Sequence, residues 1–435
     1  MSELEPHSAL LSRDLFGDLP DKWEYRKLSH GVKIRGGQVD PTEEAYPSML
    51  LIAPNHIESG TGRITGRETA EEQGAQSGKY LCEPGDVIYS KIRPELAKAT
   101  IAPERCLCSA DMYPIDGGEV YRNRFLAWLF ISKPFTQWVS LQSQRVAMPK
   151  VNRETLSRLR APTPPLEHQD AIISYLDRKT SEIDTTLSRA QELKNLLMEQ
   201  REALVKSSVT GGPSPAKSAS SGVDWIGKIP EHWDVVRTRF VAELHSGHTP
   251  DRSNDEYWED TDIPWVTTSD IKPFREGRKR YLHQTENQIS ELGMENSGAH
   301  LLPEGTVFLS RTASVGFSGI MGKPMATSQD FANWVCGDEI LPEYLLYVFR
   351  SMGQEFDRLM QGSTHKTIYM PDIKSFKTPL PPVEEQREIV EHIETETERL
   401  WELIDRVEET IDLLEEKRQA IITAAVTGQI DVPDV

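Results

Sequence analysis

Basic and hydroxyl side chains follow two hydrophobic runs of the chain, GDVIYS at 85–90 and GTVFLS at 305–310. Lys and Arg side chains can neutralise phosphates, and Arg, Lys and Ser side chains can hydrogen-bond to base edges. A charged run on its own is more often a solvated face, but its repetition at the ends of two similar runs favours nucleic-acid binding. The candidate residues are Ser90, Lys91, Arg93 and Lys98 in the first region and Ser310 and Arg311 in the second.

A second basic group lies in the segment IKPFREGRKR at 271–280, where five cations surround a single glutamate. A loop of this kind on a rigid scaffold can neutralise phosphates. Its charge therefore adds Lys272, Arg275, Arg278, Lys279 and Arg280 to the candidate set.

Motifs for catalysis are missing from the sequence. It has no GxSxG, HExxH or strand-linked GxGxxG segment, and GGPSPAKS at 211–218 has alanine where a phosphate-binding loop has its last glycine. Neither TPPL nor LPPV has the flanking residues that an amino-methyltransferase needs. The four cysteines are too few for a disulfide framework and lack a second Cys/His pair at zinc-ligand spacing. We expect a non-catalytic chain with no bound metal and with reduced, packed cysteines.

The composition is typical of a soluble protein with several domains. The chain has 435 residues, 37% of them hydrophobic, and its longest apolar stretch, FLAWLFI at 125–131, is far shorter than the ~18 residues of a membrane span. Its first residues show no basic and apolar leader regions. The net charge of −19 would disfavour nucleic acid, but −11 of it lies in residues 381–435. We expect a cytoplasmic protein whose larger segments are less acidic than the whole.

The chain repeats itself. DLFGDLPDKW at 14–23 returns as DWIGKIPEHW at 224–233, and PPLEHQ at 164–169 returns as PPVEEQ at 381–386. From the second pair onward the offset stays at 217 residues as far as the two VTG segments. This period is much longer than that of a solenoid repeat, so it indicates two domain-plus-helix units.

Each unit begins with a region of short β-rich runs broken by Gly, Pro, Asn and Asp. We expect two mixed, mainly β domains with a few helices, such as those at 123–132 and 342–361. Segments without Gly or Pro follow at 167–208 and 384–427, and each predicts a helix of about 40 residues.

Heptad a and d positions continue through both predicted helices. A helix of ~60 Å with one apolar stripe needs a partner, and the other copy is the nearest one, so we expect an antiparallel coiled coil. The alternative, that each helix packs on another protein, is compatible because the remaining faces are free. The seam positions are Ile173, Leu176, Thr180, Ile183, Leu187, Ala190, Lys194, Leu197, Arg201 and Leu204, then Val390, Ile393, Thr397, Leu400, Ile404, Val407, Ile411, Leu414, Arg418 and Ile421.

The expected architecture is α+β, with two mixed, mainly β domains separated by two long helices in a pseudo-twofold repeat. The Pro/Gly/Ser-rich segment GGPSPAKSASSG predicts a flexible linker. The expected segments are a first domain at 1–165, a first helix at 166–210, the linker at 211–222, a second domain at 223–380, and a second helix with the C-terminal tail at 381–435.

Five long segments carry a family resemblance: GDVIYSKIRP at 85–94, SGVDWIGKIPEHWDVV at 221–236, SGHTPDRSNDEYWEDTDIPWVTTSDI at 246–271, PPVEEQ at 381–386 and AAVTGQIDV at 424–432. In the right order and over nearly the whole chain, they resemble the DNA-specificity (S) subunit of type I restriction-modification systems. The resemblance implies two target-recognition domains, each reading one half of a bipartite site in double-stranded DNA. It also implies long helices that dock two methyltransferase (M) subunits, to which restriction (R) subunits are added.

The resemblance also carries site residues. It supports Ser90, Lys91 and Arg93 in the first domain, and it adds Thr249 and Arg252 to Ser310 and Arg311 in the second. No cofactor is expected on this chain, since S-adenosylmethionine, ATP and Mg are implied only for the partner subunits. Membrane is not an expected partner. A different interpretation, a coiled-coil scaffold with two β-rich protein-binding domains, stays open at this point, and an enzyme is a third.

Overall fold

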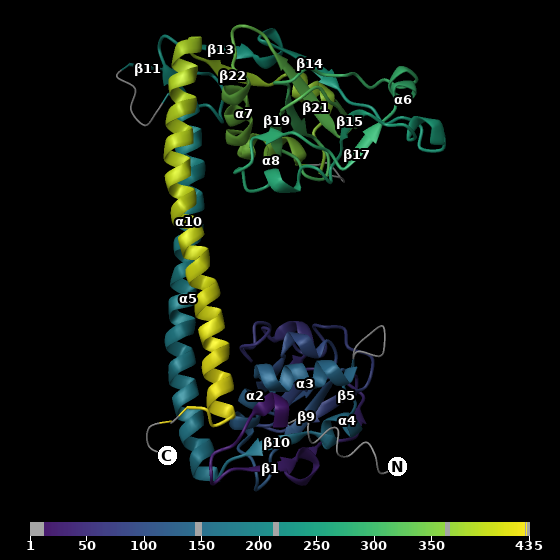
Figure 1. The fold of residues 1–435 in the computed structure, drawn as a ribbon, viewed down its shortest axis with the longest axis vertical. Helices are drawn as coiled ribbons and strands as arrows, with labels where there is room; N and C mark the ends of the chain where they lie inside the picture. The colour runs from purple at the N-terminus through teal and green to yellow at the C-terminus, as the bar shows by residue number, and fades with distance from the viewer. Residues whose placement is uncertain (1–12, 144–149, 212–216, 362–365, 431, 433–435) are drawn as a thin grey trace. The chain divides into compact units, whose positions relative to one another are not determined.

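The computed structural model describes residues 13–143, 150–211, 217–361, 366–430 and 432. The chain divides into two compact units, unit 1 with residues 1–191 and 408–435 and unit 2 with residues 192–407. Each unit therefore combines one β-rich domain with part of each long helix (Figure 1).

The β-rich domain of unit 1 contains two four-stranded sheets and a separate strand pair. The sheets have the orders β2-β9-β6-β7 and β3-β5-β8-β4, and β1 pairs with β10. Only β4 and β8 run parallel among these neighbours. The strands are β1 (Glu24–Lys27), β2 (Lys33–Ile34), β3 (Gln38–Val39), β4 (Leu51–Ile52), β5 (Lys79–Cys82), β6 (Val87–Ser90), β7 (Ala99–Ile101), β8 (Cys106–Cys108), β9 (Met112–Asp116) and β10 (Arg160–Thr163).

Short helices complete this domain. Helix α2 (Asn123–Ile131) is apolar on nearly all sides because it is buried from Phe125 to Ile131, which explains the apolar run FLAWLFI. It packs against β6 and β7, and the ring of Tyr89 on β6 lies 5.4 Å from that of Phe130. The other helices are α3 (Lys133–Ser143), α4 (Arg153–Arg158) and the 3-10 turns η1 (Leu28–His30), η2 (Pro54–His56) and η3 (Pro94–Leu96).

The β-rich domain of unit 2 has a five-stranded sheet, β14-β21-β18-β19-β16, and a three-stranded sheet, β17-β15-β20. Two strand pairs, β13 with β22 and β11 with β12, lie beside them. The strands are β11 (Ser218–Ser220), β12 (Lys228–Pro230), β13 (Asp234–Arg237), β14 (Ala242–Ser246), β15 (Ile263–Val266), β16 (Tyr281–Leu282), β17 (Asn287–Ile289), β18 (Val307–Ser310), β19 (Ser318–Met321), β20 (Ala326–Thr327), β21 (Phe331–Cys336) and β22 (Lys377–Leu380).

Helix α7 (Pro342–Ser351) covers β18 and β19, as α2 covers β6 and β7 in unit 1 (Figure 1). The helix expected at 342–361 is in fact two helices, because the chain leaves helical geometry at Met352 before α8 (Gly353–Met360) begins. The remaining elements are α6 (Glu291–Glu295), α9 (Met370–Lys374) and the turns η4 (Thr238–Phe240), η5 (Asp255–Tyr257) and η6 (Lys272–Phe274).

The linker expected at 211–222 is only partly a linker. Residues 212–216 lie outside the described residues, whereas Ser218–Ser220 form β11 and pair antiparallel with β12. The backbone of a Ser/Ala segment therefore finds hydrogen-bond partners that its composition did not indicate.

The two long helices are α5 (Leu166–Val209) and α10 (Val383–Val426), with 44 residues each. In unit 1 the first turns of α5, at Ile172 and Leu176, share a core with Ile422 near the end of α10. In unit 2 Leu197 of α5 instead packs with Leu400, Trp401 and Ile404 of α10. The beginning of each helix thus lies beside the end of the other, and the expected antiparallel pairing is confirmed. Among the described residues, no helix is both long and apolar enough to cross a lipid bilayer.

The repeated Pro-Pro motif ties each long helix to its own domain. Gln169 is fully buried, donates to the carbonyls of Val120 and Pro164 at 2.9 Å, and accepts from a backbone N–H at 2.7 Å. Gln386 is equally buried and makes the equivalent three bonds, to the carbonyls of Glu339 and Pro381 and from the N–H of Leu341. One amide side chain therefore fixes the same junction in both units.

Candidate nucleic-acid interface

The two serines that close the repeated hydrophobic runs lie at the ends of β6 and β18. Both are buried, and each hydroxyl donates to the backbone carbonyl two residues ahead, Ser90 to Ile92 at 3.1 Å and Ser310 to Thr312 at 3.2 Å. Their oxygens are turned into the protein rather than toward solvent. The two serines hold the turns that follow the strands, and their direct contact with DNA stays a prediction.

The turns after β6 and β18 share a strained backbone. Arg93 and Ala313 occupy equivalent positions, three residues after the serines, and both have left-handed backbone angles, with φ of 47° and 56°. Such a conformation in a residue with a Cβ costs of order 1 kcal/mol or more and is often found at functional sites. The side chain of Arg93 is exposed, so this turn carries a cation at the surface of unit 1.

In both units a second turn is hydrogen-bonded to the first. The backbone N–H of Lys91 donates to the carbonyl of Asp111 at 3.0 Å, and that of Arg311 donates to the carbonyl of Asp330 at 2.9 Å. The two aspartates end the segments SAD at 109–111 and SQD at 328–330. This shared Ser-x-Asp pattern is a signal that a search for cations alone misses.

In unit 2 three segments that are distant in the sequence meet at Gln329. Arg311 Nε donates to the backbone carbonyl of Gln329 at 2.9 Å. The hydroxyl of Thr249 donates to Oε1 of the same residue. The structure therefore brings two of the candidate residues together and adds the exposed Gln329, a side-chain type that can bond bidentately to adenine. Arg252, three residues after Thr249, is exposed.

The corresponding region of unit 1 is more basic. Lys91 lies over the ring of Tyr113, with its Nζ 5.2 Å from the ring centroid, and donates to the carbonyl of Ala110. Arg153 lies 5.2 Å over the same ring, and burial raises the pKa of the Tyr113 hydroxyl. Lys150 forms an ion pair with Asp111 at 3.5 Å.

These contacts place two residues, Lys150 and Arg153, beside the candidate Lys91. The sequence analysis missed both because neither follows one of the two repeated hydrophobic runs. Lys98 lies apart from this group in its hydrogen bonding, since its Nζ donates to the carbonyl of Pro54 at 2.7 Å.

The basic segment at 271–280 is held against a long helix. Arg278 forms a bidentate ion pair with Asp405 of α10, at 2.8 and 2.9 Å, and lowers the pKa of that carboxyl. Arg280 pairs with Glu394 of the same helix. Helix α10 thus supplies carboxylates that the local sequence does not show, and contact of all five cations with phosphates stays a prediction.

Within the described residues, the other three cations of the segment form no ion pair. Arg275 lies 5.9 Å over the ring of Phe317, and Lys279 lies 5.4 Å over the ring of Phe274. Lys272 is exposed at the start of η6. These three side chains stay candidates for phosphate contacts.

The cysteines are packed rather than arranged as ligands. Cys82, Cys106 and Cys108 lie in a small apolar core with Ile52 and Ile88. A hydrogen bond with Cys82, together with burial, raises the pKa of Cys106 well above its ordinary value. Within the described ranges, no group of three or more His, Cys, Asp or Glu side chains could hold a metal ion.

Comparison with known proteins decides the family. The family model of the type I restriction modification DNA specificity domain matches residues 20–195 and again residues 230–421. The chain belongs to this family. The specificity family thus accounts for both halves of the internal repeat, and the match is to a recognition domain rather than to a catalytic one. The expected fold, with two mixed domains and two long helices, is confirmed.

Curated members of the specificity family match at different lengths. The EcoDI specificity subunit of Escherichia coli is 35% identical over 187 residues, which are 41% of each chain. The MjaIX specificity subunit of Methanocaldococcus jannaschii is 32% identical, over 38% of each chain. This chain thus spans about two fifths of the length of these first relatives. The putative MjaX specificity subunit of the same archaeon is 22% identical over 96% of this chain and 95% of its own.

One solved structure supports the fold along the whole chain. It comes from a study of complex assembly and conformational transition of the type I R-M system, and it covers 95% of this chain and 100% of its own. The TM-score is 0.70 at 22% sequence identity. At this identity the likeness concerns the fold alone.

Proposed function

We propose that this chain is a sequence-specific DNA-binding specificity subunit of a type I restriction-modification complex, in which each β-rich domain reads one half of a bipartite site. The observation that carries the proposal is the repeated pair of turns. In each unit a cation follows a central strand, and its backbone bonds to the aspartate of a Ser-x-Asp turn. Paired rigid turns of this kind present side chains to a ligand without loss of order on binding.

The residues proposed to contact DNA differ between the two units. In unit 1 they are cations, which suit phosphates and guanine edges. In unit 2 the polar side chains of Thr249 and Gln329 stand beside Arg311, and Gln suits adenine. Different side chains on the same framework are what two unlike half-sites require. The proposed set is Lys91, Arg93, Lys98, Lys150 and Arg153 in unit 1, and Thr249, Arg252, Lys272, Arg275, Lys279, Arg311 and Gln329 in unit 2.

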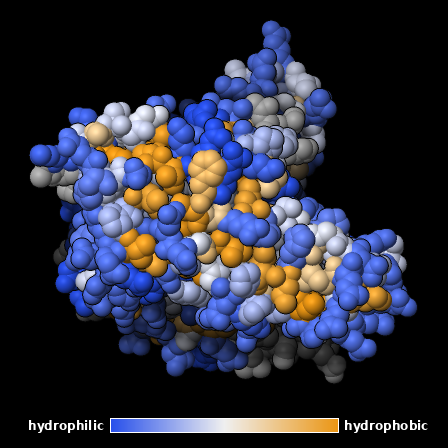
Figure 2. All heavy atoms as spheres, turned by 90° about the horizontal axis from the view of Figure 1, so that it is seen from above, coloured by the Kyte–Doolittle hydropathy of each residue, from blue (hydrophilic) through white to orange (hydrophobic). Residues whose placement is uncertain are grey.

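The long helices are proposed to dock two M subunits, to which R subunits are added. Their support lies in apolar side chains that the helix pair does not cover: Leu193 and Leu196 of α5 are 47% and 54% exposed, and Leu403 of α10 is 45% exposed. Figure 2 looks along these helices and does not show their sides; hydrophobic side chains lie among hydrophilic ones in that view as well. Exposed apolar side chains on a protein surface favour contact with another protein. S-adenosylmethionine, ATP and Mg are proposed for those partners, and the cytoplasm is the proposed compartment.

The experiment measures DNA retention by the chain together with its M partner. We would compare Lys91→Ala/Arg93→Ala with Arg311→Ala on duplexes in which one half-site or the other is scrambled. The double variant is expected to lose discrimination at one half-site and Arg311→Ala at the other. Each lost base contact costs about 1 to 3 kcal/mol.

Salt dependence separates the kinds of contact. Loss of a phosphate contact weakens binding to all sequences and reduces the slope of log K against log salt by about 0.9. A protein-binding scaffold would show neither specific retention nor a steep slope. Unchanged DNA binding in both variants would refute the proposed interface. Sequencing the methylated positions of the source genome would identify the bases of the bipartite site.

A further inference from the structure

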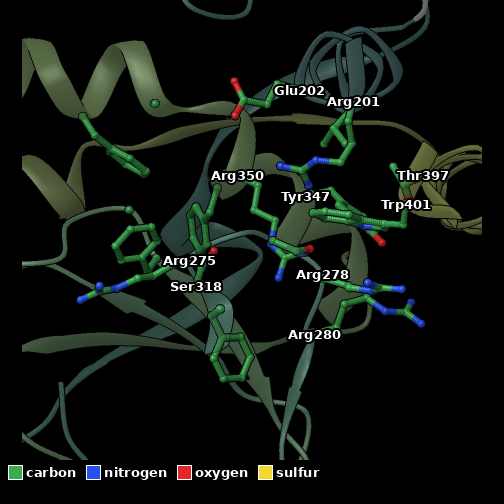
Figure 3. A pocket seen from close by; sticks show the side chains of 18 of the residues that line it. Arg201, Glu202, Arg275, Arg278, Arg280, Ser318, Tyr347, Arg350, Thr397 and Trp401 are labelled. Carbon is green, nitrogen blue, oxygen red and sulfur yellow. The ribbon is translucent and has the colours of Figure 1, made fainter. Parts of the chain in front are cut away.

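Unit 2 contains a pocket of about 620 Å³ between its parts of α5 and α10, helices α7 and α8, and the loop that follows η6 (Figure 3). Five arginines line the pocket: Arg201, Arg275, Arg278, Arg280 and Arg350. Arg278 and Arg280 are paired with carboxylates of α10. Arg201 and Arg350 have surroundings different from those of Arg278 and Arg280.

In the described part of the chain, the hydrogen-bond acceptors of Arg350 are two neutral carbonyls. Its two terminal nitrogens donate to the carbonyls of Gly277 at 2.7 Å and Lys279 at 2.6 Å. Burial lowers its pKa to about 10, and the neighbouring charges of Arg201 and Arg280 act in the same direction. A partly buried guanidinium among like charges is stabilised when an anion joins it.

Arg201 lies on the opposite side of the same space. It is 8% exposed, and its Nε is buried without a hydrogen-bond partner among the described residues. Its guanidinium lies 5.0 Å over the ring of Trp401, and burial lowers its pKa. In Figure 3 the side chains of Arg201 and Arg350 converge beside Tyr347. The charges of Glu202 and Glu276 act on Arg201, but within the described residues neither Arg201 nor Arg350 forms an ion pair with a carboxylate of the pocket lining.

Unit 1 shows how the same position is neutralised. Arg418 is the repeat equivalent of Arg201, and its Nε donates to Asp184 at 2.8 Å while its Nη1 donates to the carbonyl of Gly60 at 2.7 Å. The repeat equivalent of Asp184, 217 residues later, is Trp401. Unit 2 has thus kept the buried arginine and replaced its carboxylate by an indole ring.

The glycine carbonyl that bonds Arg418 in unit 1 also has a counterpart in unit 2, but this counterpart bonds a different arginine. Gly277 lies beside Arg201 as Gly60 lies beside Arg418, and both glycines have left-handed backbone angles, with φ of 77° and 70°. The carbonyl of Gly277 accepts from Arg350 instead. Arg201 thus lacks both the carboxylate and the glycine carbonyl that accept hydrogen bonds from Arg418 in unit 1. Its side chain lines the pocket instead.

We infer that this pocket binds a small oxyanion, a phosphate or carboxylate group, that takes the place at Arg201 which Asp184 has at Arg418. Charge-assisted hydrogen bonds from the buried guanidinium of Arg201 and the partly buried one of Arg350 would hold it, and the bound anion would link the helix pair of unit 2 to its β-rich domain. The site is lined only by unit 2 and does not rest on the DNA-binding function proposed above.

The test follows thermal unfolding of the full chain, without DNA, in phosphate, in acetate and in chloride at equal ionic strength and pH. A ligand that binds only the folded state raises the Tm of unit 2, on the order of 3 °C at ten times its Kd. Phosphate also stabilises proteins by exclusion from their surfaces, so the relevant quantity is the difference from Arg201→Met. The wild-type chain is expected to show a saturable rise that Arg201→Met lacks.

Two further variants control the result. Arg418→Met removes the arginine that already has its carboxylate, so the response to the anion is expected to stay. Trp401→Asp supplies unit 2 with the carboxylate of unit 1, so the response is expected to disappear although Arg201 is present. This variant also tests the inference if Arg201→Met fails to fold.

The two anions identify the source of the group. A response to phosphate alone indicates a phosphate ester, whereas a response to acetate as well indicates that an acidic side chain would fit. Equal Tm values in phosphate, acetate and chloride would overturn the inference, as would a full response in Arg201→Met or in Trp401→Asp.

Discussion

Replacement of Gln386 by methionine tests how the long helix is joined to the β-rich domain of unit 2. The side chain is fully buried, and its amide donates to the carbonyls of Glu339 and Pro381 at 2.8 and 2.9 Å and accepts from the N–H of Leu341 at 2.9 Å. Methionine has nearly the same volume and shape but cannot replace any of these bonds. The variant thus removes polar contacts and leaves packing nearly unchanged.

The expected cost follows from the three bonds. At about 1 kcal/mol net for each, the loss is roughly 3 kcal/mol, and it grows where a buried partner is left unsatisfied. For a unit of this size, about 2 to 4 °C of Tm corresponds to 1 kcal/mol, so the transition of unit 2 should fall by roughly 6 to 12 °C.

Differential scanning calorimetry measures the transitions, and hydrogen exchange assigns them to the units. Gln386→Met should speed exchange at the N–H of Leu341 and at the start of α7. Gln169→Met should act in the same way at the Arg122 N–H of unit 1, since Gln169 makes the equivalent bonds. Glu384→Gln is the matched control on an exposed site of the same motif, where a change within about 0.5 kcal/mol is expected.

The reasoning would be refuted if Gln386→Met unfolded at the same temperature as Glu384→Gln. It would also be refuted if exchange at Leu341 did not change. Either result would mean that packing of the Pro-Pro motif, rather than the buried amide, fixes the helix to the domain.

Three other predictions concern the helices and the pH dependence of stability. Ile404→Asp is expected to destabilise unit 2 by several kcal/mol in urea unfolding because Ile404 is only 1% exposed. Leu403 is 45% exposed, so Leu403→Asp should keep the fold and weaken binding to the M partner. Equal effects of the two variants on stability would contradict the pairing of the two helices through Ile404. Arg418→Met removes the nearer of two arginines that pair with Asp184, since Arg63 lies 3.9 Å from the same carboxylate, and should cost about 1.5 to 3 kcal/mol; a loss below 1 kcal/mol in urea unfolding would count against the Arg418–Asp184 pair. Burial raises the pKa of Tyr25 to about 12 from 10.0, so the neutral phenol stabilises the folded chain fully below pH 10, and this contribution is lost as the pH rises toward 12. Tyr25→Phe should therefore flatten the curve of unfolding free energy against pH between 10 and 12. Coincident curves for the two proteins would disprove this contribution.

Much of the architecture could be predicted from the sequence because the controlling signals are local or periodic. The absence of Gly and Pro after each Pro pair predicted helices at 166–210 and from 381, and the structure has Leu166–Val209 and Val383–Val426. The heptad pattern predicted which side chains face the partner helix, since a 3.5-residue period fixes one face. The repeat then indicated that the partner is the other copy.

The sequence was less informative where contacts are made between distant segments. Ser90 and Ser310 were selected for their type and position, but only the fold shows that their hydroxyls are turned inward to backbone carbonyls. Gln329 was missed because it carries no charge and gains its place from Thr249 and Arg311, which are 80 and 18 residues away.

The basic loop and the pocket show the same division. The sequence determined that five cations lie between 271 and 280, but only the tertiary structure decided that Arg278 and Arg280 pair with carboxylates of α10, while the buried Nε of Arg201 has no hydrogen-bond partner among the described residues. Periodicity and motif spacing are properties of a single segment and can be read along the chain. Charge compensation and burial depend on which segments meet, and they are therefore decided only when the chain has folded.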